Sequence, residues 1–430
     1  MSRRLSTAEE GFEAAFSRLL ARSVTAPQLS DAVRDILLRV QREGDAAILD
    51  LTNRFDRVNY GLADLRVSPE EIAAATAATS AELRDALALA ASRIEAFHRA
   101  QLPQDLAFTD ATGAELGLRW SPLDGVGIYV PGGKASYPSS VLMNAIPARV
   151  AGVSRIAMCV PAPDGVLNPL VLAAASLAGV TEIYRIGGAQ AVAALAHGTA
   201  LIPKVDKIVG PGNAYVAEAK RQVFGQVGID SIAGPSEVLI IAGPENNPAH
   251  LALDLLAQAE HDEEAQAILI TDSEALAGAV AQAVEDALQT LPRAAIAAES
   301  WRRHGAIILV RDWDEAVALA NRIAPEHLQI MTAAPKSIFA KIRHAGAVFL
   351  GSNCPEAIGD YVAGPNHVLP TSGTARFASG LAVYDFLKRT TWVALDDRAL
   401  AAIGPAAVAL AGAENLTAHA SSVSIRLQKT

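Results

Sequence analysis

Short apolar runs alternate with segments of helical periodicity along most of the chain after residue 125. The first series of runs ends in turns rich in Gly and Pro: VGIYVPGG, RIAMCVPAP, TEIYRIGG and DKIVGPGN. A second series begins at residue 236 and reads SEVLIIAG, AQAILITD, GAIILVRD, HLQIM and AGAVFLG. Strands that alternate with helices form βαβ units with a parallel sheet. The pattern therefore predicts an α/β fold with two domains in tandem.

The two ends of the chain have a helical pattern. Before about residue 110, Ser68-Pro69-Glu70-Glu71 has the form of a capping box and opens a predicted long helix through His98. The tail, residues 379–430, is mostly helical in pattern and carries too little apolar surface to fold alone. We expect the tail to dock on its own chain or on a partner.

Composition and charge narrow the class of protein. The 430 residues are 51% hydrophobic with a formal net charge of −10 and no long basic run, so we expect no nucleic-acid partner. Two cysteines make no disulfide framework, and the first residues do not form a secretory signal. The longest apolar stretches, such as 401–413, are broken by Gly and Pro. These features predict a soluble, cytoplasmic protein without a membrane segment.

Glycine-rich turns follow several of the predicted strands. YVPGGK, RIGGAQ and VGPGNAY would let a ligand phosphate approach the backbone closely, although none has the G-x-G-x-x-G pattern. A single turn of this kind is usually only a tight connection between strand and helix. Together they favour a nucleotide that lies across one edge of the sheet.

Polar residues interrupt apolar patterns at four places. Gln258 and His261 are three residues apart, so both side chains can point at one spot. Glu326 and His327 are adjacent. Asp360 and His367 lie in a loop rich in Gly and Pro, and Glu414 and His419 lie in the tail. Imidazole, carboxylate and amide ligands at wide separation suit zinc. Ordinary capping and loop roles are the alternative. By contrast, we expect His98, His304 and His344, each beside an arginine, on the surface.

Several long segments resemble histidinol dehydrogenase. They occur in the family's order and cover the chain from about residue 120 to its end: GIYVPGG, RIGGAQAVAALAHGT, VDKIVGPGNAYVAEAKRQVFG, GIDSIAGPSEVLI, LLAQAEHD, IAPEHLQI, GDYVAGPNHVLPT and LTAHASSVSIRL. The first 120 residues agree only in length and pattern. The resemblance implies an NAD-dependent, zinc-requiring oxidation of L-histidinol to L-histidine through histidinaldehyde, the last two steps of histidine biosynthesis.

The resemblance also implies a role for each candidate residue. One zinc ion per subunit would be held by Gln258, His261, Asp360 and His419. The acid/base pair would be Glu326 and His327, and NAD would contact Tyr129, Gln190 and Asn213. The substrate contacts would be Ser236, Gln258, His261, His327, Asp360, His367, Glu414 and His419. No cysteine occupies a matched position, so a covalent intermediate on Cys159 or Cys354 is disfavoured.

The implied architecture has two tandem Rossmann-like α/β domains. Residues 1–24 would be a helical extension, 25–124 with 235–378 the zinc and substrate domain, and 125–234 the NAD domain. In a homodimer the helical tail, 379–430, would cross to the partner subunit, although Asn415 stands where many members have Gly. Two other functions stay open: a paralogue that oxidises another small diol or amino alcohol, and a zinc hydrolase without NAD. The hydrolase leaves the three Gly-rich turns unexplained.

Overall fold

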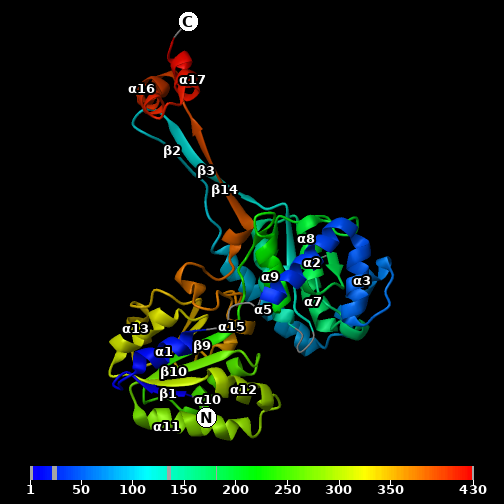
Figure 1. Ribbon diagram of the computed structural model, residues 1–430, viewed down its shortest axis with the longest axis vertical. Coiled ribbons are helices and arrows are strands. Elements are labelled where there is room, and N and C mark those ends of the chain that lie inside the picture. The colour runs from blue at the N-terminus through cyan, green and yellow to red at the C-terminus, as the bar shows by residue number, and fades with distance from the viewer. Residues whose placement is uncertain (1–2, 22–26, 133–136, 181, 429–430) are drawn as a thin grey trace.

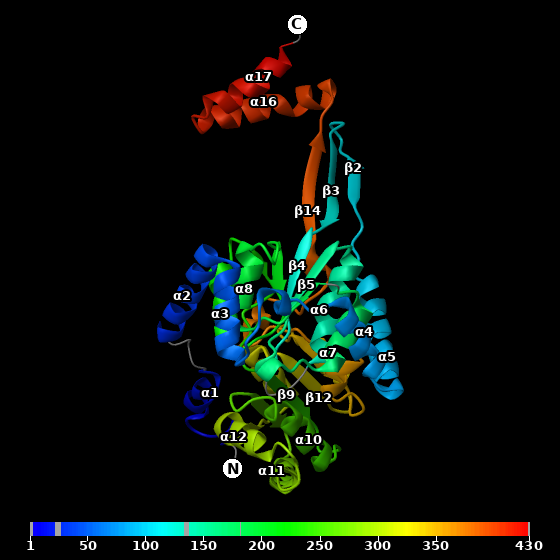
Figure 2. The same ribbon diagram turned by 90° about the vertical axis from the view of Figure 1, so that its right-hand side faces the viewer.

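Two parallel sheets follow one another along the chain, and an arm carries the C-terminal helices away from both (Figures 1 and 2). The computed structural model describes residues 3–21, 27–132, 137–180 and 182–428. Within these ranges, none of the helices combines the length and the apolar character that a membrane crossing requires. The tandem α/β prediction is confirmed.

The first sheet has five parallel strands in the order β6-β5-β4-β7-β8. The strands are β4 (Gly125–Tyr129), β5 (Arg155–Cys159), β6 (Glu182–Tyr184), β7 (Lys207–Val209) and β8 (Gly228–Ile229). The connecting helices are α6 (Pro138–Ala151), α7 (Pro169–Ala178), α8 (Gly188–His197) and α9 (Ala214–Val223). From β4 the chain adds β5 and β6 on one side and then β7 and β8 on the other, so the strand order reverses between β4 and β7. Ligands of doubly wound folds bind at the carboxyl ends of the strands at such a switch point.

Four N-terminal helices cover both faces of this first sheet. They are α2 (Pro27–Glu43), α3 (Asp45–Asp56), α4 (Pro69–Ala78) and α5 (Ala81–Arg99). α2 packs on α8 and α9, α4 on α7, and α5 on α6. Their apolar side chains belong to the two cores of the first sheet. The expected grouping of residues 25–124 with 235–378 therefore differs from the packing, which joins these helices to the 125–234 domain.

The predicted long helix from residue 69 to His98 is interrupted. Ser68 caps α4 as expected: its Oγ accepts a hydrogen bond from the Glu71 backbone N, and Glu71 Oε2 accepts one from the Ser68 N. A second helix, α5, starts after Ser80, whose hydroxyl oxygen accepts from the Leu83 N. The sequence Thr79-Ser80 breaks the helix because a serine side chain satisfies the free N–H groups of a new first turn.

The second sheet has six parallel strands in the order β1-β11-β10-β9-β12-β13. The strands are β1 (Arg3–Ser6), β9 (Glu237–Ala242), β10 (Gln266–Thr271), β11 (Ala306–Leu309), β12 (His327–Met331) and β13 (Ala347–Leu350). The helices around it are α1 (Phe12–Leu20), α10 (Pro248–Ala259), α11 (Glu274–Leu288), α12 (Ala294–His304), α13 (Trp313–Ile323), α14 (Pro335–Phe339) and α15 (Ala357–Tyr361). The extension 1–24 is thus not wholly helical: β1 supplies an edge strand that pairs with β11.

The arm is a three-stranded antiparallel sheet in the order β14-β3-β2, which extends from the first sheet (Figures 1 and 2). Its strands are β2 (Leu106–Thr109), β3 (Glu115–Pro122) and β14 (Leu387–Ala394), and its tip carries α16 (Asp397–Ala413) and α17 (Thr417–Leu427). The tail is therefore not wholly helical. Its segment KRTTWVA is rich in β-branched and aromatic residues, which favour a strand, and β14 pairs with β3 along its whole length.

Candidate active site

The candidate site lies at the amino edge of the second sheet. Ser236 directly precedes β9, and Glu326 directly precedes β12, where His327 is the first residue and pairs in register with Val238. The short segment 230–236 joins β8 of the first sheet to this edge. The loop after Asp360 also reaches the first domain, because the Asn366 side-chain amide donates to the Met143 carbonyl O of α6 at 2.6 Å. The site therefore faces the first domain.

His327 is buried and fixed in one tautomer. Its Nδ1 lies 3.0 Å from the Glu237 carbonyl oxygen, which can only accept, so Nδ1 carries the proton and Nε2 keeps a lone pair. Burial lowers the pKa of His327 to about 4, against an ordinary value of 6.5. The imidazole is therefore neutral near pH 7 and able to accept a proton at Nε2.

Glu326 is held by the backbone N–H of Glu237, the residue whose carbonyl holds His327. One of its carboxylate oxygens, Oε2, accepts a hydrogen bond from the Glu237 N at 2.8 Å and lies 3.7 Å from His327 Nδ1. Burial raises the pKa of the Glu326 carboxyl well above its ordinary value. A carboxylate with a raised pKa is a stronger base than an exposed one, and this suits a group that removes a proton from water.

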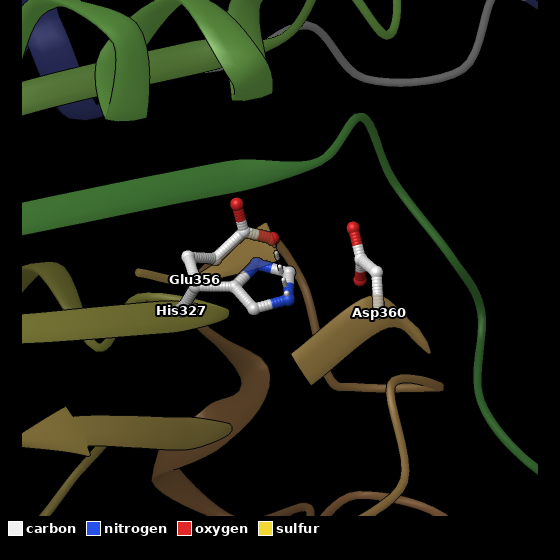
Figure 3. A group of neighbouring side chains, drawn as sticks. All are labelled: His327, Glu356 and Asp360. Carbon is white, nitrogen blue, oxygen red and sulfur yellow. Dashed lines mark ion pairs between the residues drawn. The ribbon is translucent and has the colours of Figure 1, made fainter. Parts of the chain in front are cut away.

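Two further carboxylates approach His327 from the segment around α15 (Figure 3). Glu356 Oε1 lies 3.5 Å from His327 Nε2, and single donor atoms of His327, Glu356 and Asp360 all lie within 4.8 Å of one another. Burial raises the pKa of Glu356. Burial acts in the same direction on Asp360, but its hydrogen bond with His367 and the nearby imidazoles outweigh it, and the Asp360 pKa is lowered.

Sequence reasoning did not identify Glu356. It lies four residues before Asp360, inside the segment that was singled out for Asp360 and His367. Residues four apart lie on the same face of a helix, so this spacing was the available indication that the two carboxylates are neighbours. Its burial was not visible in the sequence, because the residues beside it are small or polar. The structure also buries His98, which was expected on the surface: its Nδ1 lies 2.7 Å from the Ile94 carbonyl O.

Gln258 lies in the last turn of α10, and His261 follows shortly after the end of that helix. Gln258 is fully buried, and among the described residues neither its Oε1 nor its Nε2 has a hydrogen-bond partner. A buried amide without partners is destabilising by about 1–3 kcal/mol per group, so it indicates a ligand. His261 is exposed and close enough to influence the pKa of both His327 and Asp360. The imidazole of His261 and the carboxylate of Asp360 are donor types that zinc accepts, whereas the group that the described residues bring within ligand distance of one another is His327, Glu356 and Asp360.

The two tail candidates lie far from this group within one chain. Glu414 follows α16 and His419 lies on α17, at the tip of the arm (Figure 1). Both line a groove of about 590 Å³ between these helices, with Leu410 and Val423 among its apolar residues. One chain thus brings together Ser236, Gln258, His261, Glu326, His327, Asp360 and His367, and leaves Glu414 and His419 apart.

The three candidates for NAD contacts lie at the carboxyl edge of the first sheet. Tyr129 ends β4, and its hydroxyl oxygen accepts a hydrogen bond from the Gly188 N at 3.1 Å. Gln190 lies in the first turn of α8 and is buried, and its Oε1 has no partner among the described residues. Asn213 caps α9. These residues surround the switch point between β4 and β7, where the fold is suited to a nucleotide.

A buried ion pair supports the turn that leads to Asn213. Gly210 has φ +110°, and a Cβ there would lie 2.1 Å from the Tyr129 carbonyl O, so only glycine fits. Its N–H donates to Asp230 Oδ2 at 2.7 Å, and its carbonyl accepts from Lys220 Nζ at 3.0 Å. Lys220 and Asp230 also pair with each other while nearly fully buried. Sequence reasoning assigned neither residue.

Comparisons with known proteins agree over the whole chain. The family model for histidinol dehydrogenase matches residues 20–427. Histidinol dehydrogenase of Gluconobacter oxydans is 64% identical over 99% of this chain and 100% of its own, and that of Ruegeria pomeroyi 59% over 99% and 98%. The crystal structure of histidinol dehydrogenase from Elizabethkingia anophelis superposes with a TM-score of 0.94 at 38% identity, covering 99% of this chain and 98% of that one. The chain belongs to the histidinol dehydrogenase family of oxidoreductases.

Proposed function

We propose that the protein oxidises L-histidinol to L-histidine through histidinaldehyde, with NAD as the electron acceptor and one zinc ion per subunit. The observation that carries this proposal is the buried His327, whose Nδ1 is committed to the Glu237 carbonyl while Nε2 lies 3.5 Å from Glu356 Oε1, with Asp360 in the same cluster. Two successive oxidations need a proton acceptor at one place, and a neutral imidazole can serve in both.

The zinc ion would be held by Gln258, His261 and Asp360, with the partner subunit's His419 as the fourth protein ligand. The orphaned amide of Gln258 and the lowered pKa of Asp360 support this donor set. When bound, zinc supplies a Lewis acid that orients the imidazole and amine of histidinol. Ser236 and His367, together with Glu414 of the partner subunit, would complete the substrate contacts.

In the first oxidation, His327 Nε2 takes the proton of the substrate hydroxyl while the carbon loses a hydride. Tyr129, Gln190 and Asn213 would hold NAD, which would supply the acceptor for that hydride. The products of this step are the aldehyde, NADH and a proton held on His327. The proton must leave before the second step, because the same nitrogen serves again.

In the second oxidation, water adds to the aldehyde. In its ionised form Glu326, which burial makes more basic than an exposed carboxylate, would remove a proton from the attacking water and return it to the aldehyde oxygen. The neutral hydrate would then lose a hydride to a second NAD and a hydroxyl proton to His327, which would give the carboxylic acid. The two steps together consume one water and two NAD for each histidine, so the atoms and electrons balance.

We further propose a homodimer with exchanged tails. The support is the position of Glu414 and His419 on an arm outside the two domains, together with exposed apolar side chains on both tail helices, Leu410 at 66% and Ile425 at 67%. Asn415 adopts the left-handed conformation, φ 59°, which Asn adopts more readily than most residues other than Gly, so Asn415 is compatible with a left-handed turn before His419. A cytoplasmic location suits the free thiols of Cys159 and Cys354.

The proposal is tested by NAD reduction with the purified protein before chelation, after chelation and after zinc is restored. We expect L-histidinol to be oxidised only when zinc is present, and a small amino alcohol without an imidazole to be a poor substrate. Equal rates with the simple amino alcohol would favour the paralogue alternative. Absence of NADH formation with every alcohol tested would contradict the proposed function.

A further inference from the structure

Gln329 is a buried amide within an otherwise apolar part of β12. Side chains alternate along a strand, so His327, Gln329 and Met331 share one face. That face packs against α10, because Met331 belongs to the same core cluster as Leu251 and Leu255. A glutamine in this place must be hydrogen-bonded, since burying a free amide is costly. None of the roles proposed above uses it.

Each end of the Gln329 amide holds a different element. The Nε2 donates to Asp254 Oδ2 at 2.6 Å, and Oε1 accepts from the Glu356 backbone N at 3.2 Å. Asp254 lies on α10, one turn before Gln258. Glu356 directly precedes α15, which carries Asp360. One side chain therefore connects the two segments that supply the candidate ligands with the strand that supplies the base.

We propose that Gln329 is a positioning residue of the active site. It fixes the distances between Gln258 on α10, His327 on β12 and Asp360 on α15. This inference rests on the proposed function, because it concerns the zinc and the base of that same site. Groups that hold ligands from behind contribute about 10–100-fold to metal affinity or activity, so the loss of Gln329 should weaken both.

The matched control is Gln266, another buried glutamine at the start of a strand in the same sheet. Its Nε2 donates to the carbonyls of Leu19 and His304, which belong to elements without candidate site residues. Gln329→Met and Gln266→Met replace an amide by an apolar group of similar shape in similar surroundings. A general weakening of the sheet would affect both variants alike.

The experiment measures zinc affinity by chelator competition, together with kcat and the KM for NAD, on the full-length protein. For Gln329→Met we expect zinc affinity about 10–100-fold weaker and kcat about tenfold lower. The KM for NAD should stay within about twofold, because the first sheet is untouched. Gln266→Met should resemble the wild type in all three quantities.

A second pair of variants tests the same contact if Gln329→Met does not fold. Asp254→Asn keeps a carbonyl oxygen that accepts from Gln329 Nε2 and should retain zinc, whereas Asp254→Leu should lose affinity. Equal zinc affinity for Asp254→Asn and Asp254→Leu, or for Gln329→Met and the wild type, overturns the positioning role alone. If the wild-type protein neither binds zinc nor reduces NAD, the proposed function and this inference fall together.

Discussion

The buried pair of Lys220 and Asp230 gives a prediction whose size can be worked out from the structure. Lys220→Met removes the cation and leaves the Gly210 N–H as the remaining hydrogen-bond donor to the Asp230 carboxylate among the residues that the structure describes. Breaking a buried pair on one side is destabilising by about 3–5 kcal/mol, because an uncompensated charge stays buried. We therefore expect Lys220→Met to lower the free energy of unfolding by that amount.

An exposed ion pair in the same part of the chain is the natural control. Arg57 and Asp164 pair with 63% of each side chain exposed, and such pairs contribute about 0–1 kcal/mol. Arg57→Met should thus change stability little. In the double variant Lys220→Met/Asp230→Asn no charge is buried, so part of the lost stability should return, with a coupling energy of about 0.5–3 kcal/mol.

Two assays read out the same structural change. Urea unfolding followed by circular dichroism compares the stability of the wild type, Lys220→Met, Asp230→Asn, the double variant and Arg57→Met, and steady-state kinetics compare the KM for NAD. Since the pair holds the turn that leads to Asn213, Lys220→Met should raise the KM for NAD and leave zinc content unchanged. If Lys220→Met were no less stable than Arg57→Met and bound NAD normally, the account of this turn would be refuted.

Three further predictions concern the site. Glu326→Gln should slow the aldehyde step more than the alcohol step, while His327→Asn should slow both by about 10²–10⁴-fold in single-turnover assays; equal effects of Glu326→Gln on both steps would contradict its role. Mixing inactive His419→Ala and Asp360→Ala homodimers should restore up to about a quarter of wild-type activity after subunit exchange, and no recovery after proven exchange would exclude crossed tails. In the metal-free protein, unfolded His327 takes up a proton that the native residue refuses, so between pH about 6.5 and about 4 the wild type should lose stability relative to His327→Asn by at most about 1.4 kcal/mol per pH unit. The raised pKa values of Glu326 and Glu356 act in the opposite direction in both proteins, so the comparison by urea unfolding is made between the two, and an identical pH dependence would refute the burial argument.

Much of the fold was predictable because parallel strands buried on both faces leave continuous apolar runs. EVLIIA and QAILIT became β9 and β10 for this reason. The edge strand β1 was missed because RRLS has no apolar run, and its pairing depends on the free edge of β11. Helical periodicity showed that residues 27–99 had an apolar face, but not which sheet that face would cover.

The candidate site was predictable only where a residue stood out against its surroundings. Gln258 broke an apolar helix, and the structure leaves its amide buried without a partner among the described residues. Glu356, Gln329 and Lys220 did not stand out, because their importance comes from burial and from contacts over long sequence distances. Resemblance supplied roles for matched positions, whereas these supporting residues required the geometry.

The central claim is that one buried base beside one set of metal ligands serves two successive oxidations. The measurement that tests it most directly is the number of NADH molecules formed per histidine, with free histidinaldehyde trapped by a carbonyl reagent in a parallel reaction. We predict two NADH per histidine and no accumulation of trapped aldehyde. One NADH per histidinol consumed, with aldehyde accumulating in the trap, would contradict the account.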